Sequence, residues 1–183
     1  GNDDDSDSSV PTTVVRLALA GRETPLQLPA AIYWHPRLSP DGSRLARYDK
    51  VHLFRFARCD EAYDETRTIE RGAEVVALDA PFGRIGLTIC YDLRFPELYR
   101  ALGDCALVCV PSAFTWTTGS AHWHLLLRAR AVENQTWVLA AAQGGVHENG
   151  RRTCGRALLV DPWGEVAAER SEDGPGFVAG LCD

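Results

Sequence analysis

The sequence contains no methionine, so the printed chain does not begin at its own initiator residue. We expect a fragment of a longer reading frame rather than a processed protein. It also lacks any apolar run near the roughly 20 residues of a membrane helix, and no basic-then-apolar signal segment opens it. These absences predict a cytoplasmic protein with no membrane partner.

Positive charge is also scarce, with 19 Lys and Arg against 25 Asp and Glu and a net charge of −6. A nucleic-acid surface needs clustered basic residues, so we expect no nucleic-acid partner. The 183 residues are 45% hydrophobic, which is ordinary for one globular domain. Residues 1–9 are acidic and polar, which predicts a disordered tail before a single domain at 10–183.

The six cysteines form no CxxC pair, which excludes a zinc knuckle, and they do not resemble the dense disulfide framework of a short secreted domain. His122 and His124 are two residues apart on an expected helix, so they point in different directions and cannot chelate one ion together. The acidic residues 3–7 lack the ligand spacing of a calcium loop. We therefore expect no metal and no cofactor.

Turns and periodicity predict an α/β fold with helices covering a sheet. Residues 74–79 and 84–90 read as a hairpin, and residues 96–102 as a helix that begins at proline and ends before glycine. The strongest helix is expected at 119–135, with Ser120 as its cap. A turn is expected at 39–42, a polar loop at 144–152, and strands at 14–21, 30–34, 43–50, 105–111, 136–142, 156–161 and 165–169.

Cys90 closes a β-rich run and precedes a tight turn into a helix. Such an elbow lifts a side chain out of the end of a sheet and leaves backbone N–H groups free to face a reacting carbonyl. The pattern alone leaves two interpretations open, a nucleophile and a buried structural thiol. It does not decide between them.

Several segments in order resemble known blocks of one family. GLTICYDLRFPELYRALG is similar to the nucleophile block of the carbon–nitrogen hydrolases (nitrilase-like amidases), and ARYDKVHLF to their lysine block. PSAFTWTTGSAHWHLLLRARAVENQ, HENGRRT and VDPWGEV also match, so the resemblance runs from about residue 38 to the end. It is closest to the branch that hydrolyses deaminated glutathione and related ω-amides. It implies part of a four-layer α-β-β-α sandwich, assembled as a homodimer or higher oligomer.

The resemblance also implies a Glu–Lys–Cys site. Cys90 would be the nucleophile, Lys50 the cation that stabilises the oxyanion, and Glu65 a glutamate that orients the lysine, while the backbone N–H of Tyr91 would assist at the oxyanion. These roles agree with the chemistry, because a thiol with an ordinary pKa needs a nearby cation or base to become a nucleophile. Without the resemblance, Lys50 would be read as a surface lysine and Glu65 as a solvated loop acid.

The chain also departs from the family pattern. Only Glu23 precedes Lys50, in a segment unlike the one that bears the family's general base, so we expect that base and the N-terminal portion to be missing. His124 stands where relatives usually carry an acid, near the active site, and Arg156 replaces a common histidine. By analogy, Arg151 and Arg152 would meet a substrate carboxylate, although two solvated loop arginines remain the alternative.

The leading hypothesis is a thiol amidohydrolase that acts with water on a small amide and releases ammonia and a carboxylic acid through a Cys thioester. The rival is a truncated or degenerate homologue that serves as a binding or assembly module without turnover. A papain-like protease is excluded because no histidine and asparagine follow Cys90 in a recognisable setting. Nitrile hydrolysis is disfavoured, because the match is to the amidase branch.

Overall fold

The computed structural model describes residues 13–19, 22–28, 46–58, 61–172 and 174–182. The expected tail at 1–9, strand at 30–34 and turn at 39–42 lie outside these residues. Within the described residues, no helix is long and apolar enough to cross a membrane.

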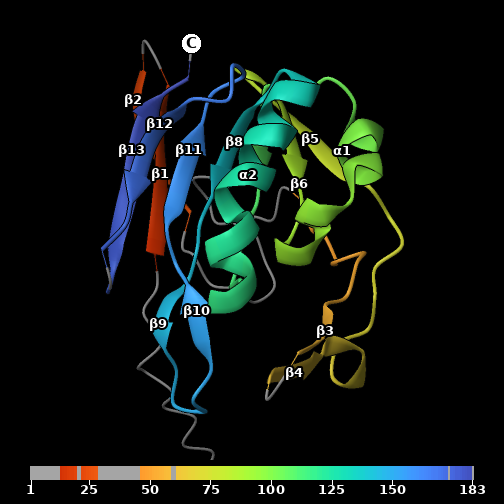
Figure 1. Ribbon diagram of the computed structural model, residues 1–183. Helices are drawn as coiled ribbons and strands as arrows, with labels where there is room; N and C mark the ends of the chain where they lie inside the picture. The colour runs from red at the N-terminus through yellow and green to blue at the C-terminus, as the bar shows by residue number, and fades with distance from the viewer. Residues whose placement is uncertain (1–12, 20–21, 29–45, 59–60, 173, 183) are drawn as a thin grey trace, which may run out of the picture.

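A six-stranded mixed sheet forms the centre of the molecule, in the order β12-β11-β8-β7-β6-β5 (Figure 1). Its strands are β5 (Val76–Ala80), β6 (Gly83–Leu87), β7 (Leu107–Cys109), β8 (Trp137–Ala140), β11 (Ala157–Val160) and β12 (Val166–Arg170). Strands β6, β7 and β8 run parallel, so their carboxyl ends meet at one edge of the sheet. That edge is the one at which α/β proteins commonly bind ligands.

Helices α1 (Pro96–Leu102) and α2 (Trp116–Asn134) cover one face of this sheet (Figure 1). Trp123, Leu127 and Ala131 repeat every four residues along α2 and are at most 1% exposed, so they form its buried stripe. Helix α1 confirms the proline start and the Gly103 end. The start of α2 was wrongly predicted, because Thr115, not Ser120, caps it by accepting a hydrogen bond from the Thr118 N–H.

A second, three-stranded sheet has the order β13-β1-β2, from β1 (Thr13–Leu19), β2 (Arg22–Leu28) and β13 (Gly176–Leu181). Strand β13 packs on the central sheet, where Val178 is 4% exposed and a Cβ at Gly180 would meet the Leu159 side chain. The described residues thus supply a helix layer and two sheets. Strand β2 runs through Pro25 and lies at the edge of this sheet, the position at which a strand tolerates proline.

Two small hairpins extend beyond the edge where β6, β7 and β8 end (Figure 1). One joins β3 (Arg55–Arg58) to β4 (Glu61–Asp64) and leads into the 3₁₀ turn η1 (Glu65–Arg67). The other joins β9 (Gly144–Val146) to β10 (Arg152–Cys154), so the expected polar loop contains two strands. The strand expected at 43–50 is absent from residues 46–50, which have no regular structure.

Candidate active site

Cys90 opens a short 3₁₀ turn, η2 (Cys90–Arg94), just beyond the end of β6. Its φ of 50° lies in the left-handed region that residues with a Cβ rarely adopt. Its N–H donates to the Pro111 carbonyl beyond β7, at 2.9 Å, which helps hold this conformation. Strain of this kind costs about 1–3 kcal/mol and gathers at functional sites. The expected strand-to-helix elbow is therefore present.

Lys50 is the single lysine of the sequence, and it is buried, with 6% of its surface exposed. Its Nζ donates to Glu65 Oε2 at 2.5 Å, and the Phe54 N–H donates to the same oxygen at 2.7 Å. The Gly72 N–H donates to the Lys50 carbonyl at 2.8 Å, and a Cβ at Gly72 would collide with the backbone of Asp49. A buried ammonium needs such pairing, because desolvation without a partner is costly.

The half-buried Cys90 thiol is acted on by charges from three other segments. Burial raises the pKa of the thiol and is the largest effect, whereas the Lys50 ammonium lowers it. The Ala113 backbone and Arg151 also lower this pKa, and Glu65 raises it. Lys50 is therefore the main group that favours the thiolate, the form of cysteine that attacks carbon.

Tyr91 is the second residue of η2. The first hydrogen bond within this turn runs from the Asp92 N–H to the Ile89 carbonyl, at 3.1 Å, so the turn itself does not use the Tyr91 N–H. The Tyr91 ring packs edge-on against Phe54 and Phe95, at centroid distances of 5.1 and 5.4 Å. This packing links the turn to the chain beside the Lys50 segment.

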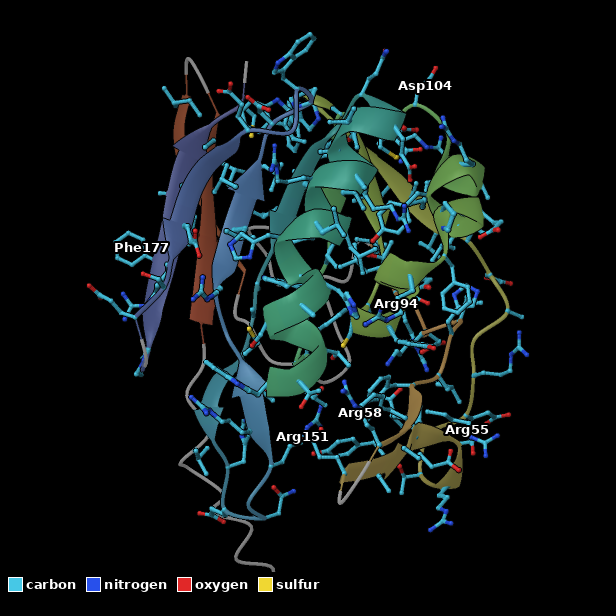
Figure 2. All side chains as sticks on the ribbon, in the orientation of Figure 1. Arg55, Arg58, Arg94, Asp104, Arg151 and Phe177 are labelled. Carbon is cyan, nitrogen blue, oxygen red and sulfur yellow. The ribbon has the colours of Figure 1, made fainter. Side chains whose placement is uncertain are left out.

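Arg151 belongs to the turn of the β9–β10 hairpin and lies on the side that faces the β3–β4 hairpin (Figure 2). Its Nη2 donates to the Ala113 carbonyl at 2.7 Å, and its guanidinium stands 5.1 Å from the centroid of the Tyr63 ring. Its Nε is buried without a hydrogen-bond partner among the described residues. Arg152 instead stacks on Trp116, 3.5 Å from the ring centroid. Two adjacent arginines therefore have different surroundings.

His124 lies within α2. Its Nε2 is 3.1 Å from Glu169 Oε1 on β12, and Arg156 Nη1 is 3.6 Å from the same oxygen. The two departures from the family pattern thus share one carboxylate. The structure brings together Cys90, Lys50, Glu65 and Arg151, whereas the contacts of His124 lead to β12.

A role for Asp92 was not predicted from the sequence, although this residue stands two positions after Cys90 in the segment GLTICYDLRFPELYRALG. It is fully buried and bonds to the segment that carries Lys50. The available signal was an acidic residue directly between Tyr91 and the apolar Leu93 in the elbow. In the described residues, no group of three or more His, Cys, Asp or Glu side chains is placed to hold a metal ion.

Residues 29–183 match the family model described as carbon-nitrogen hydrolase. A deaminated glutathione amidase of Yersinia enterocolitica is 47% identical over 135 residues, which cover 72% of this chain and 47% of that protein. A deaminated glutathione amidase of Mus musculus is 42% identical over 81% of this chain and 47% of its own length. The chain spans about half the length of these relatives.

Solved structures show the same likeness. The NitFhit protein of Caenorhabditis elegans is 45% identical, with a TM-score of 0.68, over 77% of this chain and 36% of that one. A variant of an amidase from Nesterenkonia sp. AN1 is 31% identical, with a TM-score of 0.63, over 73% of this chain and 48% of that one. Its structure shows the acetamide moiety of fluoroacetamide added covalently at its active-site cysteine.

The effect of the Lys50 ammonium on the Cys90 thiol can be tested through thiol reactivity. Lys50→Met keeps the length of the side chain and removes its charge, so we expect the pKa of the Cys90 thiol to rise further and iodoacetamide labelling to shift to higher pH. Mass spectrometry of the Cys90 peptide gives the rate at each pH. Arg152→Met, which removes a cation that stacks on Trp116, is the matched control. An unchanged profile in Lys50→Met would contradict the assignment.

Proposed function

Because the chain belongs to the carbon–nitrogen hydrolase family, we propose that it is a thiol amidohydrolase. Its substrate is a small amide of the deaminated glutathione or ω-amide type, and its products are ammonia and a carboxylic acid. This proposal rests on one observation. The Cys90 thiol stands on a strained elbow, and its pKa is affected by the buried Lys50–Glu65 pair. The names of the relatives support the substrate class.

In the proposed reaction, the Cys90 thiolate attacks the amide carbon and forms a tetrahedral oxyanion. The Lys50 ammonium and the Tyr91 N–H stabilise that charge. The intermediate collapses to a thioester as the protonated nitrogen leaves as ammonia, and water then attacks the thioester and releases the acid and the thiol. Each half of the reaction moves one proton through a carboxylate or an equivalent base.

One structural observation supports the rival hypothesis of a homologue without turnover. In the described ranges, Glu65 is the carboxylate that contacts Lys50, and its Oε2 already accepts hydrogen bonds from Lys50 and from the Phe54 N–H. A carboxylate so engaged orients the lysine well but is poorly placed to shuttle protons. A second carboxylate is therefore required for efficient turnover.

Arg151 is the proposed contact for a carboxylate on the substrate. It is close enough to lower the pKa of the Cys90 thiol, and its buried Nε has a hydrogen to donate. Guanidinium groups bind carboxylates through charge-assisted hydrogen bonds. Arg152 and His124 are less well placed for this role, because the Arg152 guanidinium stacks on Trp116 and the His124 ring contacts Glu169.

We also propose that residues 10–183 form one domain of a cytoplasmic protein. Cys90, Cys105, Cys109 and Cys154 are free thiols, and a thiol nucleophile works only in its reduced form. The proposed partners are the amide substrate, water and further copies of the chain.

Ammonia release tests the reaction itself. With deaminated glutathione and a panel of ω-amides, we expect release that Cys90→Ala abolishes, because the Cys90 thiol is the proposed acyl acceptor. Cys109→Ala, which alters a cysteine on β7, is the control and should keep the activity. We expect turnover about 10²–10⁴-fold below that of a complete site, because a proton shuttle contributes this factor. Release that survives in Cys90→Ala would refute the proposal, and no release from any amide would favour the rival.

The role of Arg151 predicts an asymmetry between neighbours. Arg151→Gln should raise KM for a carboxylate-bearing amide about tenfold to a hundredfold, because a hydrogen bond to a charged group is worth about 1.5–3 kcal/mol. Arg152→Gln is the matched control and should change KM much less. Steady-state kinetics with a carboxylate-bearing amide and its neutral methyl ester separate the effects. An equal rise in KM for both substrates would show that Arg151 does not bind the carboxylate.

Self-association is proposed through the outer face of α2. Leu125 is 67% exposed and Val132 is 51% exposed on that face, and Trp163, 83% exposed, precedes Gly164, which packs on Val132. Exposed apolar groups gathered in this way are typical of interfaces. We expect Leu125→Glu to lower the mass measured by light scattering to that of a monomer, whereas Val75→Glu, at another exposed apolar site, should not. A mass that is the same in wild type and Leu125→Glu would refute this interface.

A further inference from the structure

Asp92 is a fully buried carboxylate that accepts four hydrogen bonds. Its Oδ1 accepts from the His52 N–H at 2.9 Å and from His52 Nδ1 at 2.8 Å. Its Oδ2 accepts from the Tyr48 hydroxyl at 2.7 Å and from the Ile89 N–H at 2.9 Å. A buried ionised carboxylate is stable only with such compensation, and here each oxygen has two donors.

The four donors belong to two separate segments of the chain. Tyr48 and His52 stand two residues before and two residues after Lys50, and Ile89 immediately precedes Cys90. Asp92 therefore joins the segment that carries the ammonium to the elbow that carries the thiol. Residues 46–50 have no helix or strand of their own, so hydrogen bonds of this kind determine their path.

The two side-chain donors are themselves held in place. The His52 ring stacks on Phe95, with centroids 3.6 Å apart and planes 7° apart, which keeps Nδ1 toward the carboxylate. Because a carboxylate only accepts, the Nδ1 atom that faces it carries a hydrogen and is the donor. Burial and the charge of Asp92 raise the pKa of the Tyr48 phenol, so its hydroxyl keeps its proton and remains a donor.

We propose that Asp92 is a positioning residue that sets the placement of the Lys50 ammonium relative to the Cys90 thiol. The proposal rests on the proposed function, because it assigns Asp92 a part in preparing that site. The charged groups with the largest effects on the pKa of the Cys90 thiol are Lys50, Glu65 and Arg151, and the Tyr99 phenol also faces it. Loss of the Asp92 charge alone would lower the pKa of the Cys90 thiol, so a shift to higher pH on substitution of Asp92 would report a change in the geometry of Lys50.

Asp92→Asn tests this role with almost no change in volume. Asparagine has one acceptor oxygen, and its NH₂ group would face donors, so the two segments lose part of their connection. We expect the pH profile of Cys90 labelling by iodoacetamide to shift to higher pH, as in Lys50→Met. We also expect kcat to fall about 10–100-fold with a smaller change in KM, because small misplacements at a reacting centre have costs of this size. Asp79→Asn, at a carboxylate 88% exposed, is the matched control.

The double variant Lys50→Met with Asp92→Asn separates positioning from general destabilisation. If Asp92 acts through Lys50, its substitution adds no further shift to the labelling profile of Lys50→Met. The same additional shift in both backgrounds, or an unshifted profile in folded Asp92→Asn, would overturn the proposal. If Asp92→Asn does not fold, Tyr48→Phe, which removes one donor, should give a smaller shift in the same direction, and an unshifted Tyr48→Phe would overturn it.

Labelling requires no substrate, so the outcome for Asp92 is separate from the outcome for turnover. A shifted profile without ammonia release from any amide would support the positioning role and refute the amidase. Ammonia release together with an unshifted labelling profile of Asp92→Asn would support the amidase and overturn the positioning role.

Discussion

The site depends on the burial of one ammonium group. Lys50 is almost fully removed from solvent, and an ammonium in such surroundings is stable only beside an opposite charge. Glu65 supplies that charge, and because it comes from the turn after β4, the β3–β4 hairpin must fold against the Lys50 segment. A residue with no regular structure around it is thus placed by electrostatics and hydrogen bonds.

The second constraint comes from the central sheet. Parallel strands β6, β7 and β8 end at one edge, where the chain after β6 turns sharply and Cys90 adopts a positive φ. The Cys90 N–H is bonded to the chain beyond β7, so the elbow is connected to the neighbouring strand as well as to its own. The sheet supplies rigidity and the hairpins beyond it supply charges. Asp92 links the elbow to the lysine segment.

Local signals predicted much of the scaffold. The hairpin of β5 and β6, the proline start and glycine end of α1, and the strands β7, β8, β11 and β12 follow from β-branched runs, turn residues and capping residues. The start of α2 was missed because two hydroxyl residues compete as caps. Ser120 donates to the Trp116 carbonyl inside the helix, while Thr115 accepts from the helix N–H. Apolar and polar residues do not alternate in the charged β3–β4 hairpin, so the pairing of these two strands was not predicted.

The sequence by itself determined which kinds of residue are present at the elbow and beside the lysine, because these motifs are contiguous and their turns are encoded locally. Only the tertiary structure decided which distant groups meet there. The Arg151 guanidinium lowers the pKa of the Cys90 thiol, whereas adjacent Arg152 stacks on Trp116 and His124 bonds to β12. Spacing along the chain does not encode such distances, because they result from how the sheet edge and the hairpins pack together. In the sequence, Asp92 is simply an acidic residue within a motif. Only the folded chain places Tyr48 and His52 where they donate hydrogen bonds to it.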